Sequence, residues 1–108
     1  MREGEHVVKV AKGNHKDAAE LIRYAQPFEA SALSGRVGAG GVGYLPDEWR
    51  KRYWENASNI LFTVYSYGTP ISWLSESSNG AKTWTVPDVR YSRTTSIHQG
   101  LVRRVVGA

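Results

Sequence analysis

One β-hairpin pattern near the middle of the chain constrains its fold more than any other feature. From Ile60 to Tyr65, β-branched and aromatic residues alternate as they do in a strand whose two faces differ. Asn79-Gly80 follows as a strong hairpin-turn signal, and a second run of strand-forming residues comes after it. We interpret the interruption at residues 68–70 as a bulge or bend within one arm. The pattern predicts a core hairpin with arms at about residues 60–74 and 82–91.

Three other segments have helical patterns. Residues 15–26 carry apolar side chains at intervals of three and four, and Pro27 ends the pattern because proline disfavours helical geometry in the residue before it. Residues 46–55 open with a proline, and their acidic residues precede the basic ones, as the helix dipole favours. The third segment is residues 96–106.

This last helix carries signs of both its start and its buried face. Ser96 and Gln99 have the spacing of a capping box, in which a hydroxyl and an amide satisfy the first backbone N–H groups. The apolar residues one turn apart predict an inward stripe of Ile97, Leu101 and Val105.

Composition limits the class of protein. The chain has 108 residues, of which 41% are hydrophobic and none is cysteine. This length suits one domain with a core of its own, and the lack of cysteine excludes disulfides, thiolate zinc sites and cysteine nucleophiles. No apolar run approaches the roughly 20 residues of a membrane span, so we expect a cytoplasmic protein without membrane contact. The net charge of +4 fits solubility as well as contact with nucleic acid.

These elements, with a short strand at residues 6–10, predict a single α+β domain over residues 1–108. We expect a small, mainly antiparallel sheet packed with about three helices.

A glycine-rich stretch occupies residues 35–43, where five of nine residues are glycine. Such a stretch does not make a stable helix or central strand without strong tertiary support. Residues 38–43 match the dinucleotide-binding pattern G-x-G-x-x-G, but no helix follows directly and the chain is too short for the usual fold. We therefore interpret residues 35–43 as a flexible surface loop.

The sequence contains no arrangement typical of an active site or a metal centre. The three histidines, His6, His15 and His98, lack the spacing of metal ligands. No G-x-S-x-G nucleophile elbow occurs, and the ten acidic residues form no evident acid–base pair. We expect no catalytic residue, no metal and no cofactor, and hence a protein that is not an enzyme.

One segment of the second helix interleaves aromatic and basic side chains. Trp49 and Tyr53 flank three consecutive cations, Arg50, Lys51 and Arg52. These residue types stack on bases and contact phosphates in nucleic-acid-binding proteins. On a helix, however, the two aromatic residues would face inward while the cations spread over the solvent side, and we favour this structural interpretation.

The segment from residue 88 to residue 99 has the most specific composition. Four arginines and no acidic residue occur from Val89 onward, and hydroxyl side chains gather shortly before the last helix. A helix start attracts anions, and arginine adds bidentate contacts. The candidate binding surface comprises Arg90, Tyr91, Arg93, Thr94, Thr95, Ser96, His98 and Gln99. A structural interpretation stands beside it, in which these side chains cap the helix and bond it to the sheet.

Two segments resemble a family of small proteins common in bacteriophages. Residues 64–73 (VYSYGTPISW) resemble that family's "YSY-T-IA" strand, with Ser72 where alanine is usual. Residues 91–99 (YSRTTSIHQ) resemble its "YS-TTS-HQ" pattern. The similarity covers about residues 60–104. It implies a phage-encoded protein that acts in the host cytoplasm, and it assigns no reaction.

We therefore expect a non-enzymatic bacteriophage accessory protein that acts by binding a host or phage protein. The alternative is a small basic nucleic-acid-binding protein that uses the arginine-rich C-terminal segment and the helix at residues 46–55. Its nucleic-acid contacts would include Arg50, Lys51, Arg52, Arg103 and Arg104.

Overall fold

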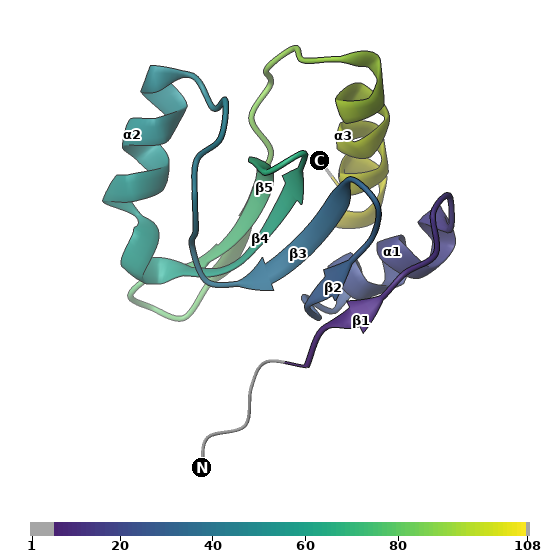
Figure 1. The fold of residues 1–108 in the computed structure, drawn as a ribbon. Helices are drawn as coiled ribbons and strands as arrows, with labels where there is room; N and C mark the ends of the chain where they lie inside the picture. Colours follow the sequence, from purple (N-terminus) through teal and green to yellow (C-terminus); the bar gives the residue numbers. More distant parts are fainter. Residues whose placement is uncertain (1–5, 108) are drawn as a thin grey trace.

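The computed structural model describes residues 6–107, which form a six-stranded sheet with three α-helices (Figure 1). The strands lie in the order β1-β2-β3-β4-β5-β6, and within these residues β1 and β2 form the one parallel pair. The predicted α+β class with a mainly antiparallel sheet is therefore confirmed. The elements are β1 (Val8–Lys9), α1 (His15–Arg23), β2 (Phe28–Glu29), β3 (Leu33–Val37), α2 (Asp47–Glu55), the 3-10 helix η1 (Ala57–Asn59), β4 (Ile60–Ser66), β5 (Thr69–Glu76), β6 (Lys82–Thr85) and α3 (Arg93–Val106).

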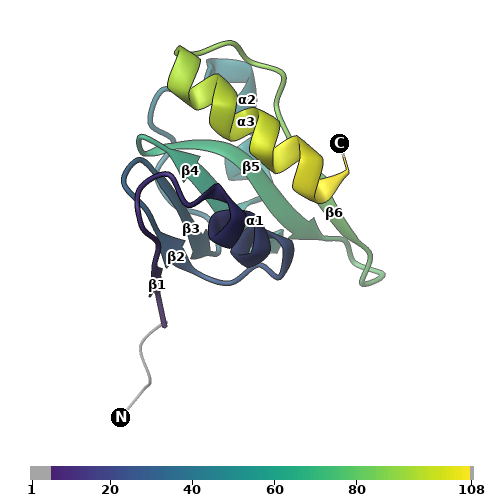
Figure 2. The same cartoon turned by 90° about the vertical axis from the view of Figure 1, so that its right-hand side faces the viewer.

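Two hydrophobic clusters lie on opposite faces of the sheet. On one face α1 and α3 pack side by side (Figure 2), and Ile22 and Val102 of these helices share a cluster with Phe62 of β4. On the other face α2 packs Tyr53 against Trp73 of β5, with ring centroids 4.8 Å apart. Each helix thus buries its apolar stripe on the sheet. No helix in residues 6–107 is long and apolar enough to cross a lipid bilayer.

β4 and β5 form a tight hairpin, so the predicted single arm over residues 60–74 is wrong. The chain reverses at Tyr67 and Gly68, whose φ angles of 52° and 79° suit a two-residue turn with both residues in left-handed conformations. This conformation is rare for tyrosine, so residue preferences alone do not predict a turn at this position. Pro70 is tolerated in β5 because β6 pairs only with residues 73–76, which leaves one side of Pro70 without a neighbouring strand.

α3 begins at Arg93, three residues before the predicted start, and the predicted capping box of Ser96 and Gln99 is wrong. Ser92 is the N-cap, and its Oγ accepts the backbone N–H of Thr95 at 3.2 Å. Ile97, predicted to face inward, is 51% exposed. The inward positions near the helix start hold polar side chains, which hydrophobic periodicity does not reveal. They are Thr95, His98 and Gln99.

Two other predicted elements are longer than the observed ones. β6 ends at Thr85, and residues 86–92 lead to α3 without regular secondary structure, so the second predicted arm was too long. α1 ends at Arg23 rather than near residue 26, because Ala25, with a φ of 51°, has already left the helical conformation before Pro27.

The glycine-rich stretch is part strand and part loop, which corrects the prediction that all of residues 35–43 form a loop. Gly35 lies in β3, between β2 and β4. A Cβ atom at this position would come 2.5 Å from the Phe62 ring and 2.7 Å from the Phe28 ring. Glycine suits this inner strand because two aromatic rings pack directly on its backbone.

Candidate binding surface at the start of helix α3

A buried hydrogen-bonded cluster joins α3 to the end of β4. Ser66 is 1% exposed, and its Oγ lies 2.7 Å from His98 Nδ1 and 3.1 Å from Thr95 Oγ1. Both partners lie on the buried side of α3. Three polar side chains thus satisfy one another in the interior, as buried polar groups must. We call Ser66, Thr95 and His98 the Ser66 junction.

We assign the order of protons in this cluster from its hydrogen-bond pattern. Ser92 Oγ donates to Thr95 Oγ1 at 3.2 Å, which leaves the Thr95 hydroxyl proton for Ser66. Ser66 then donates to Nδ1 of His98, and this order assigns the imidazole proton to Nε2. Burial lowers the pKa of His98 below its ordinary value of 6.5, and the neighbouring His15 lowers it further. The ring is therefore neutral at neutral pH.

The segment before α3 is tied to the helix by its own contacts. Gln99 Nε2 donates to the carbonyl oxygen of Val89 at 2.9 Å. Arg103 also forms an ion pair with Asp88, with Nη2 of the arginine 3.8 Å from Oδ1 of the aspartate. The hydroxyl of Tyr91 is buried and has no hydrogen-bond partner among the described residues. Burial also raises the pKa of Tyr91. The linker therefore follows α3 closely before the helix begins.

The predicted candidate surface divides into a buried and an exposed half. The buried residues, which hold the helix in place, are Thr95, His98 and Gln99. Tyr91 is half-buried. The exposed residues are Arg90, Arg93, Thr94 and Ser96. The eight residues therefore do not form one exposed surface, and the contacts of the buried three are those of a structural brace.

A serine bonded to a neutral imidazole is also a pairing found in nucleophilic catalysis. Here Ser66 Oγ is enclosed and already bonds both Thr95 and His98. Among the described residues, no carboxylate bonds to His98, and no group of three or more His, Cys, Asp or Glu side chains could hold a metal ion. Because a nucleophile must reach its substrate, this geometry suits bracing rather than attack.

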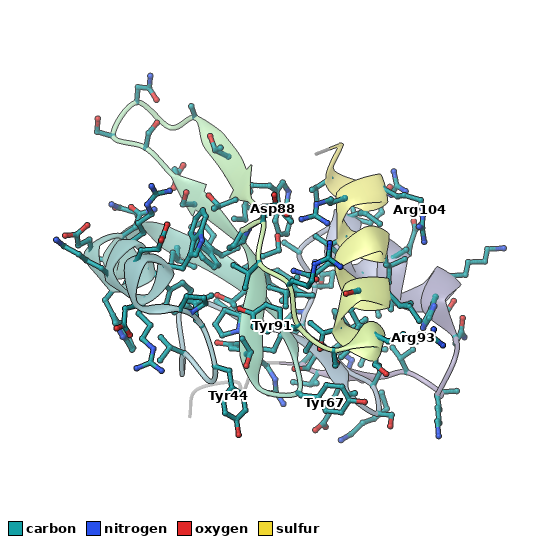
Figure 3. The ribbon with its side chains drawn as sticks, turned by 90° about the horizontal axis from the view of Figure 1, so that it is seen from above. Tyr44, Tyr67, Asp88, Tyr91, Arg93 and Arg104 are labelled. Atoms are coloured by element: carbon teal, nitrogen blue, oxygen red, sulfur yellow. The ribbon has the colours of Figure 1, made fainter. Side chains whose placement is uncertain are left out.

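A pocket of about 290 Å³ opens beside the Ser66 junction, and every residue that lines it carries a hydroxyl group. The lining residues are Tyr44, Ser66, Tyr67, Thr69, Tyr91, Ser92 and Thr95. Tyr44 is 82% exposed and Tyr67 is 60% exposed. Figure 3 shows both projecting from the same edge of the molecule, with Tyr91 set further in. We call Tyr44, Tyr67 and Tyr91 the tyrosine rim.

The rim is held together by contacts between the glycine-rich loop and the β4–β5 turn. The backbone N–H of Tyr44 donates to Thr69 Oγ1 at 2.9 Å. Gly43, with a φ of 49°, packs so closely on Thr69 that a Cβ atom there would collide with it. Sequence reasoning missed Tyr44 and Tyr67, because they lie far apart along the chain and only tertiary contacts bring them together.

The G-x-G-x-x-G motif is packed around a tyrosine hydroxyl. Gly40 N–H donates to the Tyr53 hydroxyl at 2.8 Å, and this hydroxyl contacts Thr63 Oγ1 at 2.9 Å. Thr63 in turn donates to the carbonyl oxygen of Gly38 at 2.8 Å. Tyr65 borders the same cluster, and burial raises its pKa. The N–H of Gly40 and the carbonyl of Gly38 thus bond to protein side chains, unlike the free N–H groups of a phosphate-binding loop.

The predicted basic residues do not share one face. α2, which carries Arg50, Lys51 and Arg52, lies on the opposite side of the sheet from α3, which carries Arg103 and Arg104 (Figure 1). Arg50 Nε donates to the carbonyl oxygen of Leu45 at 2.8 Å, and the Arg52 guanidinium lies 4.6 Å from the centre of the Trp49 ring. Arg50 and Arg52, two of the three cations on α2, thus already have partners on this helix or just before it.

No family model, curated protein or solved structure matches this chain. The resemblance to small bacteriophage proteins therefore depends on residues 64–73 and 91–99 alone.

Proposed function

We propose that this chain is a non-enzymatic bacteriophage accessory protein that binds a host or phage protein in the host cytoplasm. The tyrosine rim is the contact surface. The observation that carries this proposal is the exposure of Tyr44 and Tyr67, at 82% and 60%, on the rim of one pocket. Phage origin and location come from the resemblance of residues 64–73 and 91–99.

Tyrosine supports protein recognition for physical reasons. It buries a large apolar ring, offers a hydroxyl for hydrogen bonds, and loses little conformational entropy, so it is enriched at binding hot spots. The backbone of Tyr44 is fixed by Thr69, and Tyr67 lies in a two-residue turn. Side chains presented by an ordered backbone lose less entropy on binding.

The alternative, nucleic-acid binding, has less support because the cations of α2 and α3 lie on opposite faces of the sheet. Nucleic-acid binding also predicts a different dependence of binding affinity on salt concentration. Binding through phosphate contacts would be retained at about 50 mM salt and fall steeply above it. Protein binding through tyrosines would depend only weakly on salt.

Site-specific photo-crosslinking tests the proposal. A photoreactive phenylalanine analogue is placed at Tyr44, at Tyr67 or, as the control, at Tyr24, which is 63% exposed at the end of α1. In lysate of the infected host we expect one discrete adduct from the two rim positions and none from the control. Tyr44→Ala should weaken capture of the same partner at least about tenfold. Equal adducts from all three positions would refute the rim as the contact surface.

A further inference from the structure

A second pocket, of about 210 Å³, borders the His98 end of the Ser66 junction. Small apolar side chains form much of its wall, including Ala18, Ala30 and Ala32. Its volume is below the roughly 300 Å³ at which drug-sized sites begin, so it suits a small chemical group. We call it the His98 pocket.

Two helix starts border this pocket. Asn14 and His15 contribute the start of α1, and Thr94 contributes the first turn of α3. Helix starts carry partial positive charge from unsatisfied backbone N–H groups. The pocket thus lies where two such charges meet.

The ionisable side chains that line the pocket include no carboxylate. They are Lys12, His15, Tyr67 and His98. Asp17, in the first turn of α1, does not line the pocket, and its carboxylate accepts a hydrogen bond from the Asn14 side chain at 2.8 Å. The wall is therefore cationic or neutral throughout, which favours an anionic ligand.

His98 supplies an observation independent of the helix starts. Its side chain lines the pocket, yet the residue is only 6% exposed. Nδ1 is used by Ser66, whereas Nε2 has no hydrogen-bond partner among the described residues and is not one of their fully buried atoms, so it is accessible to solvent. With the proton order assigned to the Ser66 junction, the imidazole proton lies on Nε2 and makes it a donor. A solvent-accessible imidazole nitrogen of an otherwise buried side chain thus belongs to a residue that lines a pocket without carboxylates.

We propose that the His98 pocket binds a small organic carboxylate. Its oxygens would accept hydrogen bonds from His98 Nε2 and Lys12, and its apolar body would lie against the alanine wall. Charge-assisted hydrogen bonds of this kind are stronger than neutral ones. The proposal goes beyond the partner-binding function and does not depend on it.

Nuclear magnetic resonance titration of the full chain tests this site, with butyrate as the probe and the imidazole nitrogens of His98 as the reporter. We expect a saturable shift of these resonances. Lys12→Ala should weaken butyrate binding about fivefold to tenfold. The matched control Lys16→Ala, an exposed lysine of α1 that does not line the pocket, should stay within about twofold of the parent chain.

The apolar wall is tested by a second variant and by two further probes. Ala32→Leu should abolish butyrate binding by filling the pocket, with circular dichroism to confirm that the chain folds. The uncharged butyramide and inorganic phosphate should both bind more weakly than butyrate. The proposal is overturned if no shift saturates, if Ala32→Leu binds butyrate unchanged, or if either probe binds as tightly as butyrate.

A free small acid and the terminal carboxylate of a peptide share this chemistry. Titration with the dipeptide acetyl-Ala-Val distinguishes the two sources. Binding of both butyrate and the dipeptide supports the site and assigns it to peptide ends. Binding of butyrate alone supports it as a site for a free acid, and binding of neither refutes it.

Discussion

Replacing Ser66 with alanine tests the Ser66 junction directly, because this hydroxyl bonds to two side chains of α3. In the variant, His98 Nδ1 and the Thr95 hydroxyl lose their partner on β4. Neither residue can turn to solvent, since Thr95 is 5% exposed and His98 is 6% exposed. Both groups would therefore remain buried with an unmet hydrogen bond.

The expected loss of stability follows from these two groups. An unsatisfied buried donor or acceptor costs about 1–3 kcal/mol. Thr95 keeps its contact with Ser92, so the expected total is about 2–4 kcal/mol. For a chain of this length the entropy of unfolding is about 0.23 kcal/mol per kelvin, which converts this loss to a fall in Tm of about 9–18 °C.

Thermal and urea denaturation, followed by circular dichroism, measure the effect, and Ser72→Ala provides the matched control. Ser72 is 0% exposed on β5, and its hydroxyl has no hydrogen-bond partner among the described residues. Removing a buried, unbonded hydroxyl is neutral or stabilising. Equal stability of Ser66→Ala and Ser72→Ala would show that the junction does not brace α3.

Three further predictions concern the loop, the sheet and pH. Gly35→Ala should cost about 1–3 kcal/mol by overpacking two aromatic rings, whereas Gly41→Ala, where a Cβ atom meets nothing within 4 Å, should be neutral in the same urea titration. Tyr53→Phe removes the acceptor of the Gly40 N–H, so hydrogen exchange at Gly40 should quicken about fivefold; unchanged exchange would contradict this anchor. Because the pKa of His98 is lowered on folding, the unfolded chain takes up a proton first as pH falls through 6.5, and stability should fall by up to about 1.4 kcal/mol per pH unit. His98→Gln should flatten this dependence, and an equally steep loss in that variant would assign it to other groups.

The strands of the sheet were predictable where one face is apolar. Phe62 and Val64 alternate with the more polar Thr63 and Tyr65 and do lie in β4. The reversal at Tyr67 was not predictable, because a left-handed tyrosine depends on the packing of the strands on either side rather than on its own preference. The same holds for Gly35, whose place in an inner strand depends on the Phe28 and Phe62 rings.

The candidate site was predictable only in part. The polar run before the last helix correctly indicated a helix start, and the N-cap position differed by a few residues from the expected one. The contact between Ser66 and His98 joins residues 32 apart, so no local pattern could indicate it. Strand alternation does place Ser66 on the same side as Phe62 and Val64, which was the one available sign of its burial. Tyr44 carried no such sign, because its place depends on how the glycine-rich loop returns to the β4–β5 turn.

Tyr67 forms part of the wall of both pockets, the one lined by hydroxyl groups and the His98 pocket. A small acid that orders the phenol ring from one side would change the shape that a protein partner meets on the other. Thermodynamic linkage makes such an influence equal in both directions, so the partner would alter the affinity for the acid by the same factor. One aromatic side chain on a two-residue turn would then couple the small-acid site to the protein-contact surface.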